Sequence, residues 1–289
     1  MNTRTPLESN GRAFAPFCLA LLCLTLNAPV RAQTPEKATG TTQKSGATPS
    51  TTAAPDTTVT ASAPAGVVRA FYKAFRERRF RDAFALTIFK KAVEDLSAEE
   101  FEELRPDFER VAAALRDEIE IVGQQSGDNT ATIFARVASG DEASPPEPVT
   151  LLRAGGAWII GDEAKQEEVK KKGKSFFFTE RIETHHGEVQ AMLQRILAAE
   201  LIYSSQHGGM YADLNGLIRA GLVPQDLLGT ETTGYRFHVA SEKDGKSYTA
   251  GAEPARYGRT GILSFYLDQF GLKSKDTGGK PFKPSPAKK

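Results

Sequence analysis

The chain has 289 residues, and its 37 basic residues nearly balance its 36 acidic ones. This balance disfavours a nucleic-acid-binding protein, which needs a basic surface for the phosphate backbone. The length suffices for about two domains, each with an apolar core.

Residues 1–32 have the features of an export signal. Arg4 and Arg12 give a positive start, and the mostly apolar residues 13–26 are too few to cross a bilayer comfortably. Small residues at the end of the segment predict cleavage directly after Ala32. The alternative is an uncleaved membrane anchor. Cleavage would release an exported protein, periplasmic or extracellular.

Cleavage would also change the chemistry of the chain. Both cysteines, Cys18 and Cys23, would be lost, so the mature protein would contain no disulfide and no thiol. Three of the 37 basic and one of the 36 acidic residues would go, which leaves 34 against 35. No later apolar run reaches the roughly 18 residues of a membrane span, so we expect no transmembrane segment after cleavage.

Residues 33–64 are Thr, Ala, Ser and Pro with almost no large apolar side chain. Such a segment cannot bury enough surface to offset the entropy of ordering it. The composition predicts a disordered tether.

A first α+β domain is expected over residues 65–162. Its opening helix has one apolar face with Val67, Phe71 and Phe75 at helical spacing. The other face is basic, and it is either simply solvated or a surface for an acidic partner or for lipid headgroups. The basic side chains are Arg69, Lys73, Arg76, Arg78, Arg79 and Arg81.

Two further helices are expected. Residues 82–89 resemble a short one, and Ser97 with Glu100 has the spacing of a capping box at the start of a longer one. Pro106 should kink that helix or begin another, because proline lacks the N–H and clashes with the preceding turn. The apolar stripe of this run is Phe101, Leu104, Phe108, Val111 and Leu115.

Alternation with a period of two then predicts strands over 118–122, 130–137, 149–152 and 157–160. Trp158, the only tryptophan, should pack in the core. Helices followed by antiparallel strands are an α+β plan.

This stretch resembles the nuclear-transport-factor-2-like superfamily. The resemblance rests on the opening Val67–Tyr72 helix, the Phe80–Phe84 step and the closing Gly156–Ile160 strand. It implies a curved sheet that wraps a long helix as a cone with an open mouth. Some members of that family are enzymes, and many exported members are small accessory or binding domains.

A charged connector helix is expected over residues 163–188. Glu167 with Lys171 and Glu168 with Lys172 have the favourable i,i+4 order. The lysine run 170–172 is either a solvated face or a contact for anionic lipid. Three adjacent aromatic residues, 176–178, should be at least partly buried.

A second domain is expected over residues 189–281, before a disordered basic tail, 282–289. It opens with a helix whose apolar stripe ends near Gly208-Gly209, and Asp213 should cap a short helix after it. A hairpin around Asp244-Gly245 and a strand over 264–267 follow. The stripe is Val189, Met192, Leu193, Ile196, Leu197, Leu201 and Tyr203. The expected product is a long helix packed on a small antiparallel sheet.

This second domain resembles the globular domain of type IV pilin-like proteins, including type II secretion pseudopilins. The segments that carry the resemblance are Ala199-Glu200 with Tyr203, Gly209–Leu214, Ala220–Pro224, Gly234–Phe237, Tyr257–Gly261 and Ser264–Asp268. It implies a structural or assembly element, not an enzyme. The chain departs from that family because Pro16 stands where the leader site has Glu, and because no long apolar helix directly precedes the domain.

We expect no metal and no cofactor. His185-His186 with Glu188 lack a third ligand at metal spacing, and adjacent histidines on a helix point about 100° apart. Asp268 and Asp276 with nearby glycines are candidates for a calcium loop, but their spacing matches no EF-hand. His207 and His238 are isolated and are expected to be surface or helix-end residues.

No constellation for catalysis stands out: the sequence lacks a serine elbow, a Cys–His pair, a zincin helix and a phosphate loop. Asp82 and Asp117 are the candidate acids, and Asp82 fits a helix cap better. The sequence therefore favours a non-enzymatic bacterial envelope protein that binds another envelope protein or a small ligand. The alternatives are a periplasmic enzyme that uses a pocket of the first domain, and an accessory component of a pilus or type II secretion system.

Overall fold

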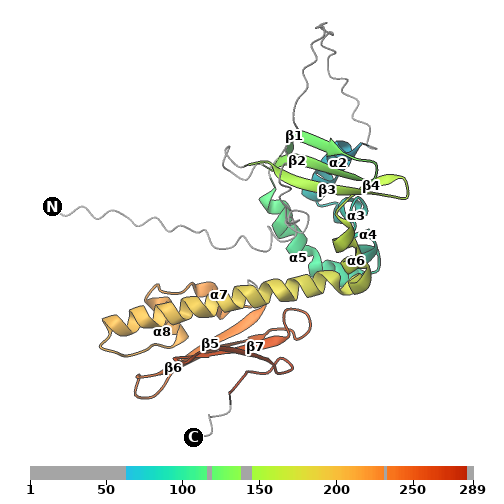
Figure 1. Ribbon diagram of the computed structural model, residues 1–289. Coiled ribbons are helices and arrows are strands. Elements are labelled where there is room, and N and C mark those ends of the chain that lie inside the picture. The colour runs from blue at the N-terminus through green and yellow to red at the C-terminus, as the bar shows by residue number, and fades with distance from the viewer. Residues whose placement is uncertain (1–62, 116–118, 138–144, 231–232, 285–289) are drawn as a thin grey trace, which may run out of the picture. The chain divides into compact units, whose positions relative to one another are not determined.

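The chain folds into two α+β units, Met1–Lys174 and Ser175–Lys289 (Figure 1). The computed structural model describes residues 63–115, 119–137, 145–230 and 233–284. Each unit has helices and one four-stranded antiparallel sheet, so the α+β class that the sequence predicted is confirmed. The first unit places a group of helices before its sheet, and the second places a long helix before its sheet.

Within its described residues, the first unit begins with four helices and continues into the sheet. The helices are α2 (Pro64–Arg76), α3 (Phe80–Ala85), α4 (Lys90–Glu94) and α5 (Ala98–Ala114). The strands, in the order β1-β2-β3-β4, are β1 (Ile119–Ser126), β2 (Thr130–Val137), β3 (Glu147–Ala154) and β4 (Ala157–Ile160).

Helix α2 lies against one face of this sheet, because its apolar side chains match those of the central strands (Figure 1). Val67 and Val68 are buried against Ile133 of β2 and Leu151 of β3. Trp158 is half-buried and packs on the same cluster, so its expected place in the core is confirmed in part.

The capping box at the start of α5 is confirmed. The Ser97 hydroxyl accepts the Glu100 N–H at 3.1 Å, and the Glu100 carboxylate accepts the Ser97 N–H at 3.1 Å. Two of the N–H groups at the start of the helix are thereby satisfied.

Ser97→Ala is expected to lower the free energy of unfolding of the first unit by about 1 kcal/mol, because one N–H at the helix start loses its acceptor. Equilibrium denaturation followed by the fluorescence of Trp158 measures this loss. A substitution to Asp, which keeps the acceptor, should restore most of it; an equal loss in both variants would contradict the capping role.

Of the two alternatives predicted for Pro106, the start of a new helix is wrong. Helix α5 continues through it from Ala98 to Ala114. Proline removes one hydrogen bond at a cost of about 3 kcal/mol, but Phe101, Phe108 and Val111 on both sides of it are buried. That buried face helps to stabilise the helix on both sides of the proline.

The single helix predicted over residues 82–89 is also wrong. Helix α3 ends at Ala85 because the following residues pair with the edge of the sheet. Ile88 N–H donates to the carbonyl of Ile160 at 3.0 Å, and Ile160 N–H donates to the carbonyl of Leu86 at 2.9 Å. Strand-like pairing with β4 thus replaces the last helical turn.

The predicted connector helix, residues 163–188, is divided in the structure. Helix α6 (Glu163–Lys172) ends at Gly173, whose φ of +53° is a left-handed conformation that glycine adopts readily. A 3-10 turn, Gly173–Ser175, follows, and the remaining residues belong to α7 (Phe176–Gln206). The long helix of the second unit therefore begins well before residue 189. The predicted pair of Glu168 with Lys172 is present at 2.7 Å.

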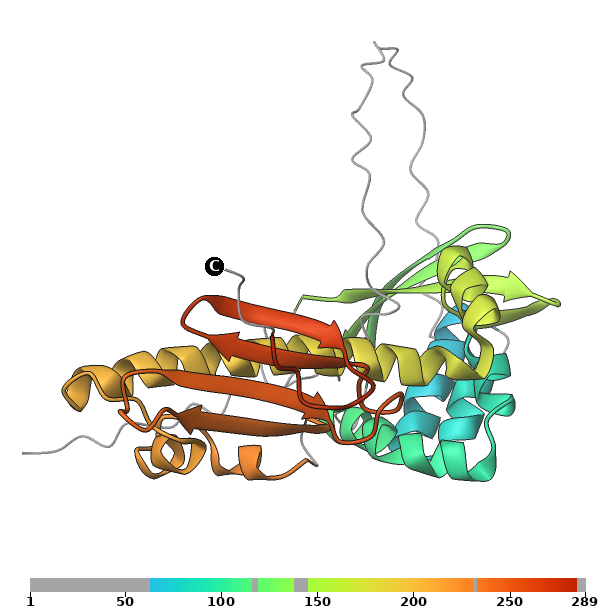
Figure 2. The same ribbon diagram turned by 90° about the horizontal axis from the view of Figure 1, so that it is seen from below.

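In the second unit, α7 covers one face of the sheet (Figures 1 and 2). The other helices are α8 (Leu214–Arg219) and a 3-10 helix, η2 (Gln225–Leu228). The strands, in the order β5-β6-β7-β8, are β5 (Tyr235–Ser241), β6 (Tyr248–Pro254), β7 (Leu263–Asp268) and β8 (Gly271–Asp276).

The core of the second unit lies between α7 and the sheet. Leu193 and Ile196 of α7 are fully buried, as are Tyr235 of β5 and Ala250 of β6. The hairpin around Asp244-Gly245 and the Asp213 cap of α8 are confirmed, the cap by a bond from the Gly216 N–H at 2.7 Å.

Several sequence predictions lie outside the described residues: the export signal 1–32, nearly all of the tether 33–64, Asp117, and the last five residues of the tail. Among the residues that are described, none belongs to a helix long and apolar enough to cross a membrane.

Candidate functional site

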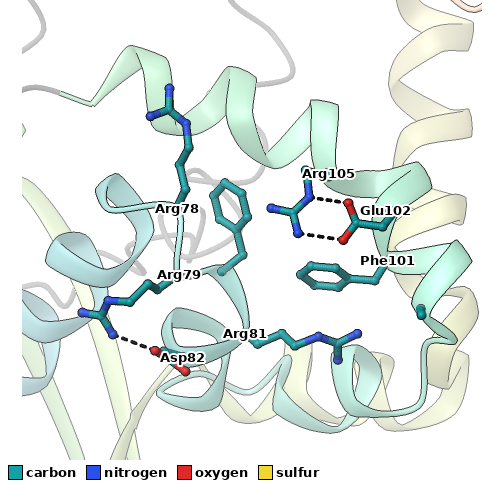
Figure 3. Close-up of a pocket in the computed structure, with 9 residues that line it drawn as sticks. Arg78, Arg79, Arg81, Asp82, Phe101, Glu102 and Arg105 are labelled. Atoms are coloured by element: carbon teal, nitrogen blue, oxygen red, sulfur yellow. Dashed lines mark hydrogen bonds and ion pairs between the residues drawn. The ribbon is translucent and has the colours of Figure 1, made fainter.

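An arginine-rich pocket of about 430 Å³ lies in the first unit (Figure 3). We call it the arginine pocket. It is open to solvent, and it is built by the α2–α3 connection, α3 and the first half of α5. Its lining residues are Arg78, Arg79, Phe80, Arg81, Asp82, Ala98, Phe101, Glu102 and Arg105.

Arg78 lines the pocket from a left-handed backbone position. Helix α2 ends in a Schellman motif, in which Arg79 N–H donates to the carbonyl of Ala74 at 2.9 Å and Arg78 N–H donates to that of Phe75 at 3.0 Å. This motif needs a left-handed residue, usually glycine, yet Arg78 occupies it with φ +59°. A left-handed arginine costs about 1 kcal/mol relative to glycine.

Two of the four arginines are held by carboxylates. Arg79 donates to Glu77 at 2.8 Å and to Asp82 at 2.7 Å. Arg105 makes a bidentate pair with Glu102, one arm of which is 2.7 Å. The hydrogen bond from Arg105 lowers the pKa of Glu102 below its ordinary value, and the nearby charge of Arg81 lowers it further. These pairs position the guanidinium groups of the pocket wall.

Arg81 is held by an aromatic ring. Its guanidinium carbon lies 4.1 Å from the centroid of Phe101, and its Nη1 donates to the carbonyl of Val93 at 3.3 Å. Arg105 lies 5.6 Å from the same ring, so the two guanidinium groups flank Phe101 (Figure 3). Cation–π contact orients both groups without neutralising them.

The pocket carries an excess of positive charge. Four arginines line it against two carboxylates, Asp82 and Glu102. Within the described ranges, neither Arg78 nor Arg81 has an ion pair. Guanidinium groups suit carboxylate and phosphate oxygens because their N–H donors are arranged as a fork. The arrangement can therefore bind an anionic group beside the guanidinium groups that flank Phe101.

Asp82, one of the two candidate acids, lines this pocket but is engaged by Arg79, and its side chain is 62% exposed. The side of the sheet that faces α2 is filled by aromatic and other apolar side chains. Phe71, Tyr72 and Trp158 are partly buried there against the apolar cluster of the strands. Burial, with the charge of Glu147 adding to it, raises the pKa of the Tyr72 phenol.

The histidines considered for a metal site have structural partners. His185 is buried, and its Nδ1 lies 2.8 Å from the carbonyl oxygen of Thr260. His186 Nε2 accepts the N–H groups of Ile262 and Leu263 at 3.3 and 3.4 Å. Across the described segments, no group of three His, Cys, Asp or Glu side chains is arranged to hold a metal ion. Both rings hold the loop before β7.

His207 and His238 do not lie in the arginine pocket. His207 is at the C-terminal end of α7, stacked on Tyr203 with ring centroids 3.8 Å apart. His238 lies on β5, 3.3 Å from a carboxylate oxygen of Glu253. The expected helix-end place is confirmed for His207.

Asp268 and Asp276 are not brought together. Asp268 ends β7 and Asp276 ends β8, a strand that the sequence pattern did not reveal because it is short and mostly exposed. Asp268 accepts the Phe270 N–H at 2.8 Å, and Asp276 accepts the Tyr257 hydroxyl at 2.9 Å. Both carboxylates serve the loops at the strand ends.

Sequence reasoning placed three of these arginines on the basic face of the first helix, which was wrong: α2 ends at Arg76, so Arg78 and Arg79 lie in the connection and Arg81 lies in α3. The basic cluster included Arg78, Arg79 and Arg81, but Phe101 and Arg105 are more than 15 residues further along the chain. Only the packing of α3 on α5 unites the two groups. The spacing of Glu102 and Arg105 on one helix face was the available signal for the second group.

Comparisons with known protein families, with curated protein sequences and with solved structures found no match to this chain.

Proposed function

We propose that the protein is an exported, non-enzymatic bacterial envelope protein that binds the acidic side chains of another envelope protein in the arginine pocket. The observation that carries this proposal is Arg78, a positively charged side chain in a left-handed position that glycine would occupy at lower energy. Strained backbone that persists is typical of functional positions.

The surroundings of Arg78 support this proposal. Arg79 and Arg105 are fixed by carboxylates, while Arg81 is oriented by Phe101 and keeps its charge available. The pocket is open to solvent, so side chains of a partner can reach these groups. The apolar filling between α2 and the sheet favours binding over catalysis, because the cone that the resemblance implies would hold an enzyme's substrate on this side of the sheet.

Arg78→Gly is expected to weaken binding of a short polyglutamate peptide at least about tenfold, because a guanidinium–carboxylate contact is lost. The same change should raise the free energy of unfolding by about 1 kcal/mol, because glycine fits the left-handed position. Fluorescence anisotropy of the labelled peptide and denaturation followed by Trp158 measure the two effects.

Arg69→Gly, which removes an exposed arginine of α2 outside the pocket, is the matched control for charge and should leave peptide affinity nearly unchanged. Equal loss of affinity in both variants would mean that the peptide responds to the net charge of the protein and not to the arginine pocket. Binding to vesicles of anionic lipid but not to the peptide would replace the protein partner with a membrane surface.

A second candidate function is an accessory role in a pilus or type II secretion system. The second unit favours it, because a long helix on a four-stranded antiparallel sheet is the plan that its pilin-like resemblance implies. The test is affinity capture from envelope extracts with the intact chain. Recovery of pilin or secretion components that depends on the second unit would support this role, and their absence would count against it.

A further inference from the structure

Glu200 lies inside the core of the second unit although its side chain can carry a charge. It is 0% exposed, and it follows buried Ile196 by four residues, so it stands in the apolar stripe of α7. Its Oε2 accepts the Ala212 N–H at 3.0 Å. Its Oε1 is buried and has no hydrogen-bond partner in the described part of the chain.

The groups around this carboxyl do not compensate a negative charge. Asp213 follows Ala212 and caps α8 with its own carboxylate. Tyr248 of β6 lies close enough for the charge of Glu200 to act on it, and its hydroxyl is also buried without a partner among the described residues. Tyr211 packs on Tyr248 with ring centroids 5.0 Å apart. A carboxylate here would lose hydration and gain no cation.

The pKa of the Glu200 carboxyl should therefore be higher than its ordinary value. Burial raises the pKa of Glu200 to about 7, the bond from Ala212 opposes the rise, and the charge of Asp213 adds to it. The carboxyl is then neutral in mildly acidic solution and charged in mildly basic solution.

The segment bonded to Glu200 joins α7 to α8 and also contacts the β5–β6 hairpin. Ala212 belongs to the connection between α7 and α8, and the neighbouring Tyr211 N–H donates to the carbonyl of Gly245 in the β5–β6 hairpin at 2.8 Å. We propose that Glu200 is a proton-controlled tie, which holds this connection on α7 when the carboxyl is neutral. When the carboxyl is charged, the cost of burying the charge exceeds the gain from the bond to Ala212, and the connection is released. The tie is independent of the arginine pocket, which lies in the other unit.

Two measurements on the full chain test the tie. The first follows the carboxyl carbon of Glu200 by NMR during a pH titration. The second follows the hydrogen-exchange protection of the Ala212 amide between about pH 6 and about pH 8, which bracket the midpoint. The variants are Glu200→Gln, a neutral side chain of the same shape, and Glu183→Gln, an exposed control on the same helix.

The expected midpoint of the Glu200 titration is about 7. Protection of Ala212 should fall about tenfold over this pH range in the parent chain and in the Glu183→Gln control, and should stay level in Glu200→Gln. A midpoint near the ordinary 4.5, or an equal loss of protection in Glu200→Gln, would overturn the proposal.

Discussion

Gly161→Ala is expected to lower the free energy of unfolding of the first unit by about 2–6 kcal/mol, the sum of backbone strain and overpacking. Gly161 follows β4 with φ +133°, a conformation almost confined to glycine. A Cβ at this position would lie 2.6 to 2.7 Å from three side-chain atoms of Ile88, which is itself buried. Since small domains are stable by about 5–15 kcal/mol, this change could unfold the unit.

The measurement is denaturation followed by the fluorescence of Trp158, which lies in the first unit and is the only tryptophan. Gly156→Ala is the matched control, because Gly156 has φ +84° in the β3–β4 turn but a Cβ added there would meet no described atom within 4 Å. Gly156→Ala should lower the free energy of unfolding by about 1–3 kcal/mol, because it adds backbone strain but no steric contact.

A double-mutant cycle separates the two causes at Gly161. Ile88→Ala removes all three atoms that the new Cβ would meet. The cost of Gly161→Ala should therefore fall by about 1–3 kcal/mol in that background, while the backbone strain remains. Additive costs would mean that contact with Ile88 contributes nothing.

Local signals predicted the fold where the controlling interactions are local. The capping box of Ser97, the cap at Asp213 and the Asp244-Gly245 hairpin each depend on residues within a few positions of one another. The error in α3 occurs where a distant segment decides. Helix α3 stops early because Ile88 pairs with Ile160, 72 residues later, and no local pattern carries that information.

The arginine pocket likewise combines a feature that is visible in the sequence with features that only the structure reveals. The arginines before and within α3 form a visible cluster in the sequence, but the aromatic ring that orients Arg81 is that of Phe101 on α5. The left-handed conformation of Arg78 is equally hidden, because arginine gives no sign of it. Glu200 did leave a signal, since a glutamate at stripe spacing after Ile196 is expected to face the core.

Glu200→Gln is expected to stabilise the second unit above neutral pH by about 3 kcal/mol. Burial raises the pKa of Glu200 from 4.5 to about 7 on folding, and each unit of pKa corresponds to about 1.4 kcal/mol. Because the folded state holds the proton more tightly, the stability of the parent chain is highest below pH 4.5. It then falls as the pH rises towards 7 and stays low above it. Gln cannot ionise, so this fall should disappear.

Exchange of the core amides of Leu193 and Ile196 on α7 measures this stability separately from that of the first unit. Glu200→Ala gives the necessary contrast. It also removes the charge, but it leaves the Ala212 N–H without an acceptor and opens a cavity, so it should destabilise the unit by about 2–4 kcal/mol in acid. Stabilisation by Gln in base together with loss by Ala in acid would identify the proton, rather than the side-chain volume, as the source of the pH dependence. If Gln instead lowered stability by the same amount at every pH, the carboxyl would be acting only as a hydrogen-bond acceptor for Ala212.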